Sequence, residues 1–186
     1  MGPALIVVGV VLVLLLAWMV GMYNRFVRVR NACNESWSGI DTELKRRYDL
    51  IPNLVNAVKG YASHEKNVLQ AVVDARARAV ASTGSPVSQA RDENVLVGAL
   101  RQLFAVVENY PQLKANENFL RLQQELANTE DRIQAARRFY NANVRDLQNL
   151  IEVFPSNLVA GMFGFRPREY FEIDQAVERA VPQVSV

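Results

Sequence analysis

Residues 117–154 read ENFLRLQQELANTEDRIQAARRFYNANVRDLQNLIEVF, the longest periodic pattern in the chain. Apolar or small side chains recur there in ten steps over 35 residues, at Phe119, Leu122, Leu126, Thr129, Ile133, Ala136, Tyr140, Val144, Leu147, Ile151 and Phe154. The mean step of roughly 3.5 residues is the period of a heptad-like seam on one helix face. The pattern predicts one very long helix over about 117–154, roughly 57 Å at a rise of 1.5 Å per residue. Asn116 can cap its start and Pro155 stops it.

A second apolar stripe lies earlier in the chain, between residues 33 and 61. Its members fall three or four apart, at Cys33, Trp37, Ile40, Leu44, Ile51, Leu54, Val58 and Tyr61, with one gap at Arg47–Tyr48. Pro52 lies inside the stripe and cannot donate a hydrogen bond to the carbonyl of Tyr48, so we expect a kink there. A complete break with Asp49 as a new N-cap is the alternative, and residues 60–63 are another possible turn.

Shorter helical stretches lie between these two stripes. Residues 68–79 show helical spacing, and residues 82–86 (STGSP) form the clearest loop. Ser85 followed by Pro86 is typical of an N-cap with proline at the first helical position. That helix should continue until Pro111 ends it. Because short connections favour antiparallel neighbours, we predict an all-α, up-and-down (four-)helix bundle.

The N-terminal segment has the features of a transmembrane helix. Residues 4–22 carry no charge, and 12 of the 17 residues from Ala4 to Val20 are Leu, Ile or Val. Nineteen residues span roughly 28 Å, close to the ~30 Å of a bilayer core. The anchor is marked by Ala4, Leu5, Trp18, Met22 and Tyr23, its aromatic residues suiting the headgroup level. A cleaved signal peptide and a buried core helix are the alternatives; the signal peptide lacks a basic start and an Ala-x-Ala site.

Charge predicts the orientation of this segment. Arg25 is the first charged residue, and Arg28 and Arg30 follow before the first acid. Basic residues beside a membrane segment favour the cytoplasmic side. We therefore predict a single-pass plasma (inner) membrane protein with a short N-terminus outside and a cytoplasmic bundle, near an anionic leaflet as lipid partner. The anchor would cover residues 1–24 and the bundle domain residues 25–186.

Composition excludes several classes of protein. The chain has 186 residues, a net charge of +2, one Cys and one His. The charge is too balanced for a nucleic-acid-binding signature, so we predict no nucleic-acid partner. One Cys cannot form an intramolecular disulfide, and one His leaves little scope for a His-based metal site.

Catalytic and cofactor motifs are missing from the sequence. His64-Glu65 belongs to neither a His-Glu-x-x-His zinc motif nor a pair of Glu-x-x-His di-iron motifs, so we expect His64 in a turn. Cys33 lies on an apolar stripe, which favours packing over nucleophilic chemistry. There is no nucleophile elbow, phosphate-binding loop or dinucleotide fingerprint. We predict no cofactor, no metal, no catalytic residue and no enzymatic activity; an enzyme in its own right is the weakest alternative.

A basic cluster at Lys45, Arg46 and Arg47 is one candidate interaction patch. It could bind phosphates or lipid headgroups, but flanking acids neutralise it and such runs usually form a solvated face. A third possibility is that part of the cluster pairs with carboxylates inside the bundle.

An aromatic cluster near the C-terminus is the second candidate. Five of the 16 aromatic residues fall within 18 positions, at Phe154, Phe163, Phe165, Tyr170 and Phe171. They either seal the end of the bundle or form an exposed patch for a partner or the membrane interface.

Polar residues beside the stripe of the long helix are the third group. They are Glu125, Glu130, Arg132, Arg137, Arg138 and Asn141. Polar groups beside a bundle core can specify register through hydrogen bonds, and we prefer this structural interpretation. Paired carboxylates for acid–base chemistry are the alternative.

Several blocks of sequence resemble the LemA family. Residues 44–55 (LKRRYDLIPNLV) and 58–62 (VKGYA) resemble its signature, and residues 110–116 (YPQLKAN) its second block. Further matching residues are Tyr23, Asn24, Asn31, Trp37, Ser38, Phe119, Thr129, Glu130, Tyr140, Asn141, Phe154, Pro155, Gly164, Phe165, Tyr170, Phe171 and Glu172, so the resemblance covers about residues 23–184. It implies a bacterial-type membrane-anchored helical bundle and supplies no activity. Some relatives carry a lipoprotein-like Cys before the Tyr-Asn pair, where this chain has Gly21-Met22.

Together these features predict a non-enzymatic protein that acts in assembly or partner recruitment at the membrane. Its protein partner is unknown, and self-association as a homo-oligomer is possible. The resemblance also suggests an accessory regulator of a membrane enzyme, such as a quality-control metalloprotease, as the alternative.

Overall fold

A computed structural model describes residues 2–173, and every regular element in these residues is a helix. The helices are α1 (Gly2–Lys59), α2 (Lys66–Ala81), α3 (Pro86–Val107), α4 (Pro111–Lys114), α5 (Glu117–Glu152) and α6 (Ser156–Phe163). The predicted all-α class is confirmed. The last part of the predicted bundle domain, residues 174–186, lies outside the described residues.

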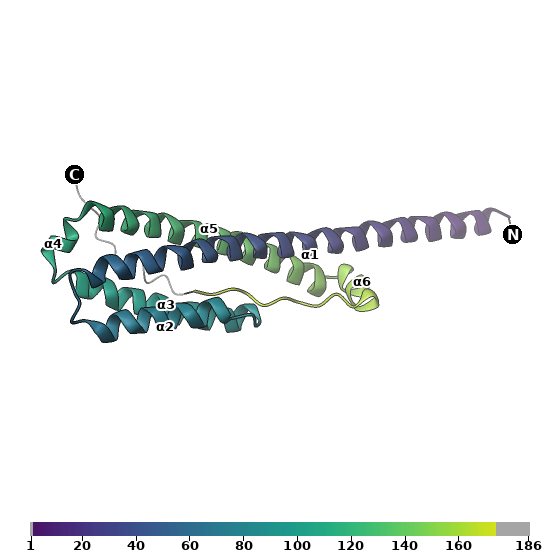
Figure 1. The fold of residues 1–186 in the computed structure, drawn as a ribbon. Helices are drawn as coiled ribbons and strands as arrows, with labels where there is room; N and C mark the ends of the chain where they lie inside the picture. The colour runs from purple at the N-terminus through teal and green to yellow at the C-terminus, as the bar shows by residue number, and fades with distance from the viewer. Residues whose placement is uncertain (1, 174–186) are drawn as a thin grey trace.

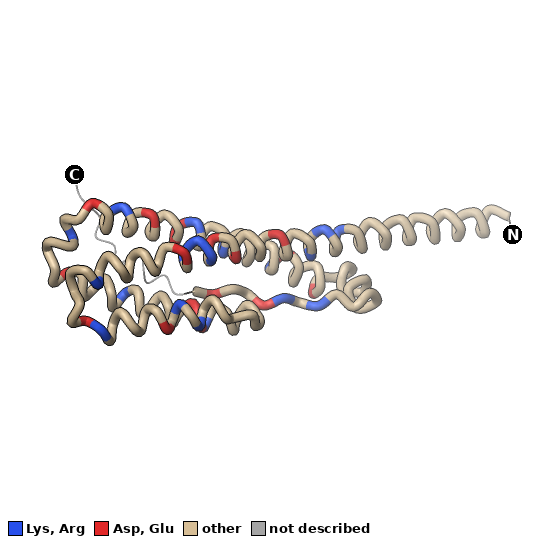
Figure 2. Tube along the Cα trace, in the orientation of Figure 1, with Lys and Arg blue, Asp and Glu red and all other residues tan. Residues whose placement is uncertain are grey.

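The four long helices run up and down, as predicted (Figure 1). α1 packs along α5, and α2 packs along α3. Beyond the bundle, the N-terminal part of α1 projects alone as a single straight extension. This part is long and apolar enough to cross a membrane, and its most apolar window is fully outside the packed core. Figure 2 shows that it carries no charged residue, whereas both acidic and basic residues occur over the bundle.

α1 continues without interruption through Pro52, so the alternative of a complete break at Asp49 is wrong. The carbonyl of Tyr48, which Pro52 leaves without a helical donor, accepts a hydrogen bond from Arg76 Nε at 2.7 Å. A side chain of α2 therefore replaces the missing backbone donor, and this substitution allows α1 to extend to Lys59. The turn predicted over residues 60–63 follows directly, and His64 lies in a turn immediately after it, as expected.

Local capping sets the helix starts as predicted. Ser85 Oγ accepts a hydrogen bond from the N–H of Ser88, and Asn116 Oδ1 accepts one from Phe119. The end of α3 differs from the prediction, because the helix stops at Val107 and does not continue to Pro111. Pro111 instead begins the short helix α4, since proline suits a first helical turn.

The long helix α5 ends at Glu152 rather than near 154. Val153 already has extended backbone, at φ −80° and ψ 136°. Because proline disfavours helical backbone at the residue before it, the helix cannot continue through Phe154. The last seam residue, Phe154, therefore lies outside α5 and is exposed.

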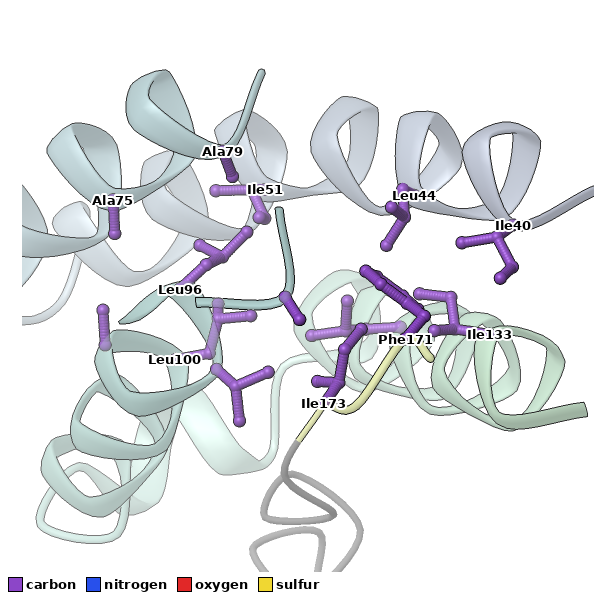
Figure 3. Packing of buried hydrophobic residues seen from close by; sticks show 14 of the residues in the cluster. Ile40, Leu44, Ile51, Ala75, Ala79, Leu96, Leu100, Ile133, Phe171 and Ile173 are labelled. Atoms are coloured by element: carbon purple, nitrogen blue, oxygen red, sulfur yellow. The ribbon is translucent and has the colours of Figure 1, made fainter. Parts of the chain in front are cut away.

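An extended segment completes the core. α6 ends at Phe163 and is capped by Gly164, whose left-handed φ of +69° suits glycine. Residues 165–173 then run back along the bundle. Figure 3 shows Phe171 of this segment near Ile40 and Leu44 of α1 and Ile133 of α5, with Ile173 on the side toward Leu100 of α3. Both side chains are buried, so the segment fills the space between the two helix pairs.

Replacing Arg76 tests whether its hydrogen bond to the Tyr48 carbonyl stabilises α1 at Pro52. Arg76→Ala should lower the free energy of unfolding by about 1 kcal/mol, because the Tyr48 carbonyl loses its donor. In a Pro52→Ala background the loss should shrink, since the backbone N–H at position 52 then serves the same carbonyl. Urea unfolding of the full-length protein in detergent, followed by circular dichroism, measures this coupling. Arg78→Ala, on the exposed face of α2, is the control. An equal loss in both backgrounds would contradict the assignment.

Candidate functional site

A buried ion cluster occupies the one gap in the apolar stripe of α1. Arg47 has no solvent-accessible surface. Its Nη1 donates to both carboxylate oxygens of Glu130 on α5, at 2.9 and 3.1 Å, and its Nη2 donates to Glu93 on α3. Tyr48 donates its hydroxyl to the other oxygen of Glu93. One side chain of α1 thereby joins three helices.

The charges of this cluster maintain one another. Burial alone would lower the pKa of Arg47, but the adjacent charges of Glu130 and Glu93 outweigh it, so the pKa is raised. Burial and the charge of Glu93 together raise the pKa of the Tyr48 hydroxyl. Arg47 therefore stays a cation and Tyr48 stays a protonated donor.

The cluster is built for structure rather than for chemistry on a substrate. Arg47, Glu93 and Glu130 are almost completely buried, and both carboxylates are engaged by Arg47. A general acid or base must reach the proton that it transfers. Glu130 therefore lies in a buried, hydrogen-bonded ion pair, which supports its structural interpretation.

A clamp on α5 holds the extended segment. Asn141 Nδ2 donates to the carbonyl of Phe171 and Asn141 Oδ1 accepts from its N–H, both at 3.0 Å. Arg137 Nη1 donates to the Ile173 carbonyl at 2.6 Å, and the Tyr140 hydroxyl donates to the Glu169 carbonyl at 3.0 Å. These side chains replace the backbone partners that an isolated extended segment lacks.

Aromatic packing adds to the clamp. The ring of Trp37 lies 5.2 Å from Phe171 in an edge-on arrangement and 5.2 Å from Tyr140, centroid to centroid. Such ring pairs add stability beyond the area that they bury. Burial also raises the pKa of the Tyr140 hydroxyl, which keeps it protonated as a donor.

A second aromatic cluster lies at the end of the bundle from which the apolar part of α1 projects. The ring centroid of Tyr23 is 4.9 Å from that of Phe163 and 5.8 Å from that of Phe165. Phe26 is fully buried and stacks on Phe165 at 4.5 Å. Arg30 lies over the Phe165 ring, 5.6 Å from its centroid. α6 is thus joined to α1 next to the predicted membrane boundary.

Two residues of the predicted interaction patches are interior. Arg47 is in the ion cluster, because pairing with two carboxylates offsets its burial, and Phe171 is in the core beneath the clamp. We therefore remove both from the candidate surface. The possibility that part of the basic cluster pairs with carboxylates inside the bundle is confirmed for Arg47.

The other residues of the two predicted patches are exposed or partly buried. Lys45 and Arg46 are exposed and pair with Asp41 and Glu43. Phe163 is half-exposed, whereas Phe165 and Tyr170 are partly buried, the Tyr170 hydroxyl donating to Gln148 Oε1 at 2.6 Å. The structure does not bring the basic pair Lys45–Arg46 into contact with the aromatic residues.

The anchor and orientation residues line the free part of α1 and its entry into the bundle. Ala4, Leu5, Trp18 and Tyr23 are exposed, or nearly so, and Met22 is partly buried against the core. Arg25, Arg28 and Arg30 are exposed immediately after them. The boundary between 24 and 25 stays a prediction, since one helix crosses it.

Glu93 and Arg76 are the functional side chains that sequence reasoning missed. Glu93 interrupts the apolar spacing of α3 between Ala90 and Leu96, in the way that Arg47 interrupts α1. Two opposite charges at the gaps of two apolar stripes are a usable signal for a buried pair. The role of Arg76 has no comparable signal in the sequence, because the atom that accepts its hydrogen bond is a backbone carbonyl.

Other chemistry finds little support in residues 2–173. Within that range there is no group of three or more His, Cys, Asp or Glu side chains that could hold a metal ion. Cys33 is buried, as expected, and burial raises the pKa of its thiol. A cleft of ≈ 550 Å³ lies between α3 and residues 167–172, and one of ≈ 800 Å³ lies beside Arg137, Arg138 and Arg145. Neither is lined by the ion cluster.

The ion cluster predicts a large asymmetry between neighbouring arginines. Arg47→Ala should lower the free energy of unfolding by about 3–5 kcal/mol, because two buried carboxylates lose their partner. Arg46→Ala, at the exposed adjacent position, should change it by less than about 1 kcal/mol. Replacing Arg47, Glu93 and Glu130 together by Met, Leu and Leu should recover most of the loss, since no buried charge then remains. Urea unfolding of the full-length protein in detergent checks all three; equal effects at 46 and 47 would contradict the burial of Arg47.

Comparison with known proteins agrees with this architecture. A model of the LemA family matches residues 36–186. Magnetosome protein MamQ 2 of Paramagnetospirillum magneticum is 29% identical, over 92% of this chain and 73% of that protein. Magnetosome protein MamQ of Magnetospirillum gryphiswaldense is 25% identical, over 98% of this chain and 78% of that protein. Protein LemA of Metamycoplasma hominis is 29% identical, over 76% of this chain and 64% of that protein.

The family match covers the ion cluster, the clamp and α6, and the resemblance noted for residues 23–35 precedes it. With the exposed apolar part of α1, it identifies a membrane-associated protein. The chain belongs to the LemA family.

Proposed function

We propose that this protein is a non-enzymatic scaffold that recruits or assembles protein partners at the plasma membrane. The observation that carries the proposal is the continuity of α1, which is at once the apolar membrane segment and a central helix of the bundle core. At a rise of 1.5 Å per residue its 58 residues reach roughly 87 Å. Such a helix holds a folded domain at a defined distance from the bilayer.

The outer face of α5 is the surface that best fits a protein partner. Phe139 on this face is 62% exposed, and the small residues Ala135 and Ala142 lie one turn to either side of it. From Arg132 to Arg145, α5 carries four arginines and no acid. Aromatic and arginine side chains dominate the binding energy of protein interfaces. The face therefore suits a partner with an apolar pocket rimmed by acidic groups.

The relatives support a structural role. The two magnetosome proteins are named for a cellular structure and not for a reaction. Their similarity extends over 92% and 98% of this chain. This similarity supports a scaffold that is anchored in the membrane and offers the outer face of α5 to a partner.

For the orientation, we propose that the bundle faces the cytoplasm. Moving Arg25, Arg28 and Arg30 outward would oppose both the positive-inside tendency and the membrane potential, the latter by ~2.3 kcal/mol per charge per 100 mV for a full crossing. A cysteine placed at Thr83, in the loop between α2 and α3, should resist a membrane-impermeant maleimide in intact spheroplasts and react after lysis. Cys33 is buried, so the wild-type chain is the unlabelled control. Labelling of position 83 before lysis would reverse the orientation.

Photo-crosslinking tests recruitment directly. Benzoylphenylalanine in place of Phe139, in otherwise native membranes, should give a reproducible adduct with a partner protein or a second copy, because the exposed ring lies at the proposed contact. The same analogue at Val73, an exposed apolar position on α2, is the control. Arg138→Glu should weaken the adduct by repelling an acidic rim. Adducts at 139 no stronger than those at 73 would count against the proposal, and capture of a membrane protease would identify the partner as an enzyme that the protein regulates.

A further inference from the structure

An uncharged apolar stretch surrounds α6. Residues 153–165 contain no Asp, Glu, Lys, Arg or His. One side of α6 is packed inward, with Ser156, Val159 and Ala160 buried. The opposite side of α6 carries Leu158 and Met162, which lie one turn apart and are 60% and 69% exposed, and Phe154, in the turn before α6, is 74% exposed. We call these three residues the outer stripe of α6.

The outer stripe lies at the membrane end of the molecule. Figure 1 shows α6 at the end of the bundle from which the apolar part of α1 projects. The contact is direct, because Phe163 of α6 packs on Tyr23 of α1 at 4.9 Å between ring centroids. Tyr23 follows the 19 uncharged residues 4–22, which span roughly the hydrocarbon core. α6 therefore lies at the level of the lipid headgroups.

Basic residues flank the outer stripe on both connected segments. Arg25, Arg28 and Arg30 are exposed on α1, and Arg166 is exposed just after α6. One acid, Glu152, directly precedes the stretch. An apolar surface rimmed by basic groups is the composition of a segment that lies in the interface of an anionic bilayer.

We propose that α6 and the turn before it form a second membrane-contact site, which inserts the outer stripe among the headgroups and upper acyl chains of the leaflet facing the bundle. The occupant is the anionic phospholipid bilayer, because the site is continuous with the membrane segment of α1. This contact goes beyond the scaffold role and does not depend on it. A single spanning helix leaves the bundle free to rotate about its axis, whereas a second contact fixes which face of α5 points away from the membrane.

Depth-dependent quenching in liposomes tests the site with the full-length protein. Leu158→Cys and Met162→Cys, each labelled with the fluorophore NBD, should be quenched by a phospholipid carrying a doxyl spin label high on its acyl chain, as expected for a depth of ~5–10 Å. Leu120→Cys is the matched control, an exposed leucine near the start of α5 at the opposite end of the bundle. The buried Cys33 of the wild-type protein controls for background labelling. Exchanging some phosphatidylcholine for phosphatidylglycerol should increase the quenching at 158 and 162 and leave position 120 unchanged.

Two results would overturn the proposal. In the first, positions 158 and 162 are quenched no more than position 120, which would place α6 in water. In the second, both probes are shielded without lipid quenching and the shielding rises with the number of proteins per liposome, which would assign the stripe to a protein contact. Two labelled positions keep the test valid if one variant fails to fold, and circular dichroism checks the fold of each.

Discussion

The guanidinium of Arg47, buried between Glu93 and Glu130, is the contact on which the arrangement of the bundle depends. α1 packs chiefly on α5 and α2 on α3, so the two pairs need a connection. Arg47 supplies it from the middle of α1, where a leucine would merely fill space. A buried ion pair is weak evidence for stability compared with apolar packing, but its geometry admits few alternatives. A shift of α3 or α5 by one turn would leave a charge buried without its partner, and this is how the cluster specifies register.

The membrane segment and the core share one helix, and the remaining features follow from that. Arg76 supplies the donor that Pro52 cannot, so α1 crosses the proline without ending. At the membrane end, Tyr23 packs against Phe163 of α6, and Phe26 stacks on Phe165, which follows α6. The chain then returns as an extended segment, whose backbone is held by Asn141. The end near the bilayer and the centre of the bundle are therefore linked by short chain segments as well as by α1.

Sequence patterns predicted the parts of this fold that local chemistry determines. The seam of α5, the caps at Ser85 and Asn116 and the apolar run of α1 depend on neighbours within a few residues, and the structure has each of them. The cluster at 45–47 left three interpretations open, because the partners of Arg47 lie 46 and 83 residues away. Phe171 could not be told from the other aromatic residues of its cluster by sequence, because its burial depends on hydrogen bonds with Asn141 on α5. The extended segment has no periodic pattern in the sequence that could predict it, since its backbone hydrogen bonds are made to side chains of α5.

Hydrogen exchange along α1, measured by mass spectrometry on the full-length protein in lipid nanodiscs, tests the central claim that membrane segment and bundle core are one continuous helix. One continuous helix should exchange slowly from the end of the apolar run through Lys59, with no fast-exchanging interruption at the arginines or at the residues around Pro52, because α1 is unbroken there and Arg76 supplies the donor for the Tyr48 carbonyl. Rapid exchange over residues 24–31 or 48–53 would show a hinge at the membrane or a break at the proline. The bundle would then be tethered to the membrane and not held at a fixed distance from it.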